Sequence, residues 1–334
     1  MSVWNLFRDD PAFQLASLTD AMNKFPFKPS RLGELGLFQE QGVPFNTVVI
    51  EERDGVLALL PFKRRGESGV VAKSEKRKVR SFAIPHIPYD DAVLAEQLQG
   101  VRAFGTENEV AGVAQVVNDR LVAMRQDHEV TLEFHRAAAI QGKVLDGADG
   151  STEIYDVFAE FGVTEKTVDF VLGTATTDVR AKCIEVSRAI EGGLGARTYD
   201  HVHAMCGSTW FDALIAHDYV KDAYHRWQDS INLRNDPRKG FEFGGITFEE
   251  YRGKVGDVSF IPAAQARFFP VGTPGLFKTY FGPADFMETV NTIGLPYYAK
   301  QKLMDFDRGV QLHTQSNPLC LCLMPRVLVK GTTS

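Results

Sequence analysis

Cys206 opens CGSTW, the stretch of this chain that comes nearest to a catalytic motif. Cysteine hydrolases of the papain type carry C-G-[SA]-C-[WY], in which the second cysteine supplies the thiolate nucleophile. Thr209 stands at that second position here, so the motif lacks its nucleophile. The stretch therefore predicts a turn from a strand into a helix, with Ser208 as the N-cap residue of the helix. A cysteine hydrolase remains an alternative only if Cys206 itself reacts.

Histidines, carboxylates and the other cysteines could hold a metal ion, but their spacing does not fit. His128 and His135 lie seven residues apart on a predicted helix, and two turns separate the rings by about 10 Å, too far for one Zn²⁺. Residues 146–153, DGADGSTE, lack the alternating oxygen ligands of a calcium loop and indicate a polar turn. Cys320 and Cys322 share one face of a strand without a second ligand pair nearby in sequence. The sequence predicts no metal, no cofactor and no enzymatic activity.

The most highly charged stretch is residues 63–80, KRRGESGVVAKSEKRKVR, with eight Lys or Arg against two Glu. Such a run could release counterions from phosphates, but no Phe, Tyr or Trp interleaves to stack on bases. A contact with an acidic surface of another subunit is the interpretation we favour, and nucleic-acid binding is the alternative. The cations assigned to this inter-subunit contact are Lys63, Arg64, Arg65, Lys73, Lys76, Arg77, Lys78 and Arg80.

The composition limits the classes of protein to which the chain can belong. Its 334 residues carry a net charge of −6 and an isoelectric point of about 5.8, whereas nucleic-acid-binding domains usually exceed roughly 9. No stretch approaches the roughly 18 apolar residues that span a bilayer, and the start has no secretory signal. Four scattered cysteines are too few for a disulfide framework. We expect a protein without membrane segments that stays in the cytoplasm where it is made.

Residues 13–44 predict an extended arm, because Gly and Pro interrupt their apolar residues without a steady period. A segment of this kind cannot bury its apolar side chains on itself. We therefore expect Leu32, Leu35, Leu37 and Phe38 to contact another part of the fold or a neighbouring chain.

Residues 45–62 predict a β-hairpin, since Asp54 and Gly55 lie between two runs rich in β-forming residues. The basic run follows this hairpin and leads to Pro85 and Pro88, which confine the chain to an edge strand or an extended conformation. The sequence thus places the basic run on a projecting loop.

Residues 106–142 predict one long helix. Thr106 and Glu109 form a capping box at its start, and Gly142 is the next strong stop signal. At 1.5 Å per residue the helix would be about 50 Å long, which suits an architectural strut. Its apolar stripe consists of Val110, Val113, Val117, Leu121, Met124, His128, Thr131, His135 and Ala138.

The rest of the chain mixes strands and short helices. Gly147 and Gly150 predict a hairpin turn after the long helix, and residues 177–193 predict a second amphipathic helix that ends near Gly192. Residues 241–262 predict a meander of three strands joined by Gly-Gly and Gly-Asp turns. These elements together predict the α+β class.

Seven stretches of the chain carry a resemblance to a known family. They are ASLTDAMNKFPFKPSRLGELGLF, RSFAIPHIP, VLAEQLQGVRAFG, RKGFEFGGITFEEYRG, FPVGTPGLFKTYFGPAD, NTIGLPYYAK and QSNPLCLCLMPRVLV. In this order, from about Phe13 to Lys330, they resemble the lambda-type major capsid protein E family of tailed bacteriophages.

The resemblance implies the Hong-Kong-97-like major capsid fold and a division of the chain into its parts. The implied parts are an N-terminal arm (1–44), an extended loop (45–90), a peripheral domain (91–194 and 286–334) that contains a spine helix (106–142), and an axial domain (195–285).

The resemblance also implies a function and a set of partners. Subunits of this family assemble as hexamers and pentamers of an icosahedral shell around double-stranded DNA. This protein would then be a late structural component of the virion, assembled in the host cytoplasm. Its partners would be copies of itself, a scaffold, a portal and a decoration or cement protein, with non-specific contact to the packaged DNA. No motif marks the Lys–Asn crosslinking of the fold's covalently linked members.

Overall fold

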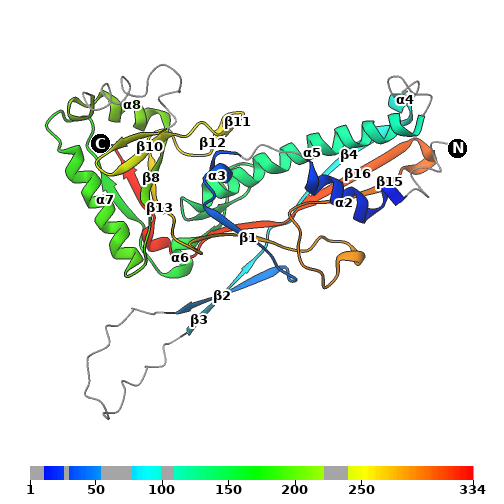
Figure 1. Cartoon of the computed structure of the whole chain (residues 1–334), viewed down its shortest axis with the longest axis horizontal. Helices are drawn as coiled ribbons and strands as arrows, with labels where there is room; N and C mark the ends of the chain where they lie inside the picture. Colours follow the sequence, from blue (N-terminus) through cyan, green and yellow to red (C-terminus); the bar gives the residue numbers. More distant parts are fainter. Residues whose placement is uncertain (1–10, 26–29, 54–76, 99–108, 222–239, 334) are drawn as a thin grey trace, which may run out of the picture. The chain divides into compact units, whose positions relative to one another are not determined.

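The computed structural model describes residues 11–25, 30–53, 77–98, 109–221 and 240–333 (Figure 1). The chain divides into two compact units. The first contains Met1–Val48, Phe82–Glu133 and Thr279–Leu319, and the second contains Val49–Ser81, Phe134–Lys278 and Cys320–Ser334. The mixture of helices and strands confirms the predicted α+β class. Within the described ranges, no helix combines the length and apolarity needed to cross a bilayer.

An antiparallel three-stranded sheet forms the centre of the first unit. Its order is β15 (Tyr298–Leu303), β16 (Gly309–Ser316) and β4 (Ile87–Leu94). Pro88 lies on β4 at one edge, as predicted, because proline has no N–H to donate to a further strand. Helices α2 (Leu15–Lys24) and α5 (Glu109–Ala139) lie beside this sheet (Figure 1). The core between them consists of Phe13, Leu18, Met22, Val93, Val117, Leu121, Met124, Tyr297, Ala299, Val310 and Leu312.

Helix α5 confirms the long helix predicted from the sequence. Thr106, its predicted N-cap, and the side chains of Val110 and Val113 lie outside the described residues. Thr131 departs from the predicted stripe, because it is half-buried and its hydroxyl donates to the Asp127 carbonyl at 2.9 Å. The other predicted stripe residues are buried: Val117, Leu121, Met124, His128, His135 and Ala138.

Gly142 ends the long helix as predicted. Its backbone has φ +72°, a left-handed conformation that favours glycine, and its N–H donates to the Ala139 carbonyl at 3.0 Å. A Cβ atom at this position would lie 2.2 Å from Cε2 of Phe158. The chain therefore turns here through a position that only glycine fits.

A six-stranded mixed sheet forms the centre of the second unit. Its order is β7 (Lys166–Asp169), β18 (Val329–Thr332), β13 (Ala266–Val271), β8 (His201–Cys206), β10 (Ile246–Glu250) and β9 (Phe241–Phe243). β10 runs parallel to β8, whereas β13 runs antiparallel to it. The sheet thus joins strands from residues 195–285 with β7 and β18, which lie outside that range.

Helix α7 (Val179–Leu194) confirms the second amphipathic helix. The Asp178 side chain caps it by accepting the Ala181 N–H at 3.0 Å, and the helix runs two residues past Gly192 to end before Gly195. Helix α8 (Ser208–Ala216) carries Trp210, whose ring packs against those of Phe170, Phe248 and Phe268 at centroid distances of 5.2–6.0 Å. The buried face of α7 consists of Val179, Cys183, Val186, Ile190 and Leu194.

The predicted meander over 241–262 and the predicted hairpin over 45–62 differ from the strand pairings in the structure. The meander predicted over 241–262 is instead two hairpins, β9–β10 and β11–β12, because β10 pairs on its other side with β8. The strand that pairs with β2 (Thr47–Arg53) is β3 (Arg77–Ala83), whereas Asp54, Gly55 and the predicted second strand up to residue 62 lie outside the described residues. The hairpin predicted at 147–150 is confirmed by β5 pairing with β6.

The remaining elements are short. β1 (Phe38–Gly42), β14 (Phe277–Phe281) and β17 (Pro318–Cys322) form a three-stranded sheet in that order. The others are η1 (Pro11–Phe13), α3 (Arg31–Glu34), α4 (Ala95–Leu98), β5 (Lys143–Leu145), β6 (Glu153–Asp156), α6 (Val157–Phe161), β11 (Lys254–Val255), β12 (Val258–Ser259), η3 (Met287–Thr289), η4 (Asp305–Asp307) and η5 (Pro325–Val327).

Candidate assembly site

Cys206 is fully buried at the end of β8 and does not have the properties of a catalytic thiol. Its Sγ lies 3.7 Å from the Ala204 carbonyl oxygen, and burial raises the pKa of the thiol well above its ordinary value. A nucleophilic cysteine needs the opposite shift and access to solvent. The cysteine-hydrolase alternative therefore has no support in the geometry.

The N-cap of α8 is Gly207, so the prediction that Ser208 caps this helix is wrong. A Cβ atom at Gly207 would lie 2.2 Å from the Pro262 carbonyl oxygen, and the neighbouring Ala263 carbonyl accepts the Trp210 N–H at 2.9 Å. Because the 262–263 backbone approaches so closely, only glycine fits the cap position, and the helix starts one residue earlier than a serine cap at 208 would require.

The two histidines of α5 are packing residues. Nε2 of His128 lies 3.0 Å from the Thr314 hydroxyl, and burial lowers the pKa of both His128 and His135 to about 4. Both rings are therefore neutral at pH 7. In the part of the chain that the structure describes, no group of three or more His, Cys, Asp or Glu is placed to hold a metal ion.

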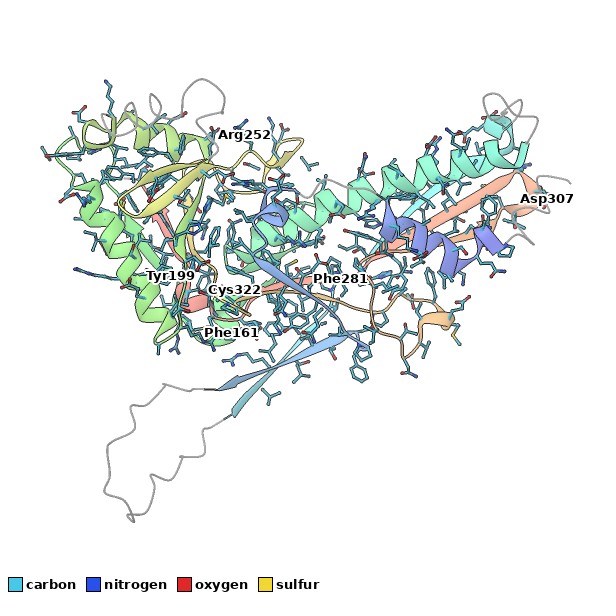
Figure 2. The ribbon with its side chains drawn as sticks, viewed as in Figure 1. Phe161, Tyr199, Arg252, Phe281, Asp307 and Cys322 are labelled. Carbon is cyan, nitrogen blue, oxygen red and sulfur yellow. The ribbon has the colours of Figure 1, made fainter. Side chains whose placement is uncertain are left out.

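Cys320 and Cys322 lie on β17, which is buried along its whole length; Cys322 is labelled in Figure 2. Burial raises the pKa of the Cys322 thiol to about 12, as it does for Cys183 on α7. All four cysteines are buried, and none of these four described residues forms a disulfide. They act as small apolar side chains.

Asp149 organises the polar turn predicted at 146–153. Its carboxylate accepts the Ser151 N–H at 3.0 Å, the Thr152 N–H at 2.9 Å and the Thr152 hydroxyl at 2.6 Å. The hydrogen bond from the Thr152 hydroxyl is the largest cause of a lowered Asp149 pKa. The carboxylate is used within its own turn, which is the structural role expected from the sequence.

Most of the basic run lies outside the described residues, so its contact stays a prediction. Arg80 is the exception. Its Nε donates to the Glu160 carbonyl oxygen at 2.5 Å, and its guanidinium carbon lies 4.6 Å from the ring centroid of Phe161, labelled in Figure 2. Arg80 therefore connects β3 to α6 within the second unit. The other cations assigned to the contact lie outside the described part of the chain: Lys63, Arg64, Arg65, Lys73 and Lys76, and the side chains of Arg77 and Lys78.

Helix α2 packs on the first unit rather than extending away from it. The Thr19 hydroxyl lies 3.2 Å from the Ala299 N–H, and the Asn23 amide donates to the Tyr297 carbonyl at 2.9 Å. β15 is the edge of its sheet, so these side chains satisfy edge groups that would otherwise need another strand. Arg125 of α5 donates to the Met22 and Phe25 carbonyls at 2.5 and 2.9 Å, at the carbonyl end of α2.

A second charged side chain of α5 holds the next turn of the same segment. Glu133 is 4% exposed, and its carboxylate accepts the Ser30 hydroxyl at 2.6 Å and the Leu32 N–H at 2.8 Å. Leu32 itself is fully buried. Part of the predicted arm is therefore fixed to its own chain by Arg125 and Glu133.

Leu35, Leu37 and Phe38, which follow that turn, are half-buried. Phe38 begins β1, and the strand pairs with β14. These three side chains keep exposed surface that a neighbouring subunit could cover, and their assignment to such a contact stays a prediction.

Sequence reasoning missed the most exposed apolar segment of the first unit. Met287, Val290, Ile293 and Leu295, between β14 and β15, are 88%, 59%, 67% and 43% exposed. In the sequence these residues are indistinguishable from a short strand or a loop packed on a core. Only the structure shows that their side chains point to solvent.

The Phage major capsid protein E family matches residues 14–333 of this chain. The chain is similar to the major capsid protein of Pseudomonas phage KPP10, with 31% identity over 96% of both chains. It is also similar to the major capsid protein of Salmonella phage Felix O1 (isolate Felix O1-VT1), with 27% identity over 95% of both chains. These comparisons do not support the alternative of a nucleic-acid-binding protein.

A solved structure gives the fold. The capsid structure of cyanophage P-SCSP1u superposes with a TM-score of 0.50 over 92% of this chain and 90% of the other, at 10% sequence identity. At that identity the likeness concerns architecture alone. The fold is that of Hong-Kong-97-like phage capsid proteins, as the resemblance in the sequence implied.

Proposed function

Because the chain belongs to the phage major capsid protein E family and is a major capsid protein of a tailed bacteriophage, we propose that its copies form hexamers and pentamers of an icosahedral shell. The shell encloses double-stranded DNA. The observation that carries this proposal is the family match over residues 14–333, which leaves almost no part of the chain for another activity. The protein acts as a structural subunit of the virion and not as an enzyme.

The proposal assigns a role to each part of the chain. Residues 1–44 are the arm, 45–90 the extended loop, 106–142 the spine helix, 195–285 the axial domain, and 91–194 with 286–334 the peripheral domain. A subunit held through several of these parts gains from multivalency, so each contact can be weak enough for misplaced subunits to leave.

The net charge of −6 supports a container for DNA. A strongly basic lining would bind phosphates tightly, whereas an acidic protein contacts the packaged DNA only weakly and non-specifically. We propose further that a scaffold, a portal and a decoration or cement protein join the shell, and that assembly takes place in the host cytoplasm.

Deletion of residues 64–76, which ends before β3 begins at Arg77, tests the role of the extended loop. The deleted stretch is largely charged or small, so we expect it to contribute little to a core. We expect a folded monomer with an unchanged melting temperature that no longer forms shells, measured by rate-zonal sedimentation beside the wild type. Normal shells from this variant would show that the loop is not an assembly element.

A second variant separates charge from length. Lys63, Arg64, Arg65, Lys73 and Lys76 become Ser while the loop keeps its length. Loss of shells in both variants identifies the cations as the contact. Loss only in the deletion assigns the contact to the length of the loop and removes the cations from it.

A further inference from the structure

Four exposed apolar side chains lie within the nine residues 287–295, between β14 and β15. We call Met287, Val290, Ile293 and Leu295, together with Phe45, the 287–295 patch; Phe45 is 66% exposed. In Figure 1 the segment is the orange stretch before β15. Single exposed apolar residues are normal on a protein surface, but a group of them marks an interaction site.

The backbone of this segment is fixed at its first half by side-chain hydrogen bonds. Thr289 donates its hydroxyl to the Ala284 and Phe286 carbonyls at 2.7 and 2.9 Å, and Thr292 donates to the Thr289 carbonyl at 2.8 Å. The Asp285 N–H donates to the Gln315 side chain of β16 at 3.0 Å. The exposed side chains are therefore carried by an ordered loop.

The second half of the segment is fixed as firmly. The Leu295 N–H donates to the Tyr298 hydroxyl at 2.8 Å, and the Ser316 hydroxyl donates to the Pro296 carbonyl at 2.7 Å. Little backbone entropy is left to lose on binding, so such a loop is prepared for a partner.

Phe45 joins the patch through the end of β1. The Val43 N–H donates to the carbonyl of Phe281, labelled in Figure 2, at 2.9 Å, and the Gly294 N–H donates to the Val43 carbonyl at 3.0 Å. Gly42 lies against the same stretch, since a Cβ atom there would be 2.2 Å from the Gly294 carbonyl oxygen. The same Cβ atom would lie 2.6 Å from Cγ2 of Ile293, and Phe45 follows Gly42 by three residues.

We propose that the 287–295 patch is a contact between copies of this chain in the assembled shell, an inference that rests on the proposed function. A second copy is the occupant we infer because the family's relatives are capsid proteins, whose shells repeat one chain many times. The five side chains of the patch are apolar and uncharged, so they complement another apolar surface and not the phosphates of DNA. The assignment adds a contact outside the basic loop and the arm.

A triple variant tests the contact with little change in volume: Met287→Gln, Val290→Thr and Ile293→Thr. All three side chains are more than half exposed, so we expect an unchanged melting temperature. Each substitution removes apolar surface that a neighbouring copy would cover. The protein concentration at which shells first appear should therefore rise about tenfold or more. A threshold equal to that of the wild type would overturn the inference.

Ile184→Thr is the matched control. Ile184 is an apolar residue on α7 of the second unit, 40% exposed. We expect this variant to assemble like the wild type. A rise as large as that of the triple variant would show that assembly responds to any loss of apolar surface, and would remove the special role of the patch.

Photo-crosslinking identifies the occupant directly. Benzoylphenylalanine replaces Val290, shells are assembled and irradiated, and the joined peptides are identified by mass spectrometry. A crosslink between two copies of this chain supports the inference. A crosslink to a different protein alone, or none in intact shells, overturns it. Absence of shells from the wild-type chain would instead contradict the proposed function, and the inference with it.

Discussion

Replacement of Glu133 by Leu should release the Ser30–Leu32 turn from α5. The variant removes both acceptors and leaves the N–H of Leu32 unpaired at a buried position. Hydrogen bonds to a charged group contribute about 1.5–3 kcal/mol each, so the loss of two should lower the free energy of unfolding by about 3–6 kcal/mol. Urea denaturation of the unassembled protein measures this change.

Native-state hydrogen exchange gives the sharper test of the same variant. The Leu32 amide should exchange slowly in the wild-type monomer and fast in Glu133→Leu, while amides of α7 in the second unit keep their protection. Ser30→Ala, which removes only the 2.6 Å hydrogen bond, should fall between the two proteins. Fast exchange of Leu32 in the wild-type monomer would refute the conclusion that this segment is held by its own chain.

Three further predictions follow from the described cores. Val117→Asp should prevent folding, because Val117 is 1% exposed in the first core, and unchanged circular dichroism and melting would contradict this placement. Gly142→Ala should destabilise the protein by more than Gly162→Ala. Both glycines have positive φ, so either substitution should cost about 1 kcal/mol or more, but only at Gly142 would the added Cβ atom clash with Phe158. Equal melting temperatures of the two variants would refute this clash. Stability should fall as the pH drops from about 6.5 to about 4, because the buried His128 and His135 have folded-state pKa values of about 4 and the unfolded state takes up the protons first. The loss of stability is on the order of 3 kcal/mol for each histidine. The slope of stability against pH should therefore be smaller in His128→Gln. A stability that does not change with pH over this range would contradict the burial of neutral histidines.

Local patterns in the sequence predicted the elements whose structure is set locally. These are the face of α7, the turn at Asp149 and, from Val117 onward apart from Thr131, the stripe of α5. Each depends on residues a few positions apart. Gly142 was predicted to stop the long helix from its residue type alone, and it has the left-handed conformation there.

Pairings between distant residues could not be predicted in this way. The parallel pairing of β10 with β8 turned a predicted meander into two hairpins. The close approach of the 262–263 backbone moved the cap of α8 from Ser208 to Gly207. In both places a partner distant in the sequence overrides the local preference.

The candidate assembly site, too, was predicted only where its residues carry a local signal in the sequence. Charge composition marked the basic run, and the irregular apolar pattern marked the arm, yet neither reveals that Arg125 and Glu133 fix part of that arm to α5. The 287–295 patch left no signal at all, because exposure of an apolar residue depends on what the rest of the fold leaves uncovered.

Negative-stain electron microscopy of the chain expressed in a bacterium, alone and with a candidate scaffold protein, is the decisive test of self-assembly. We expect closed shells, tubes or hexamers, with regular subunits in at least one of the two preparations. Monodisperse small particles in both preparations would contradict the assignment of this chain as a self-assembling shell subunit.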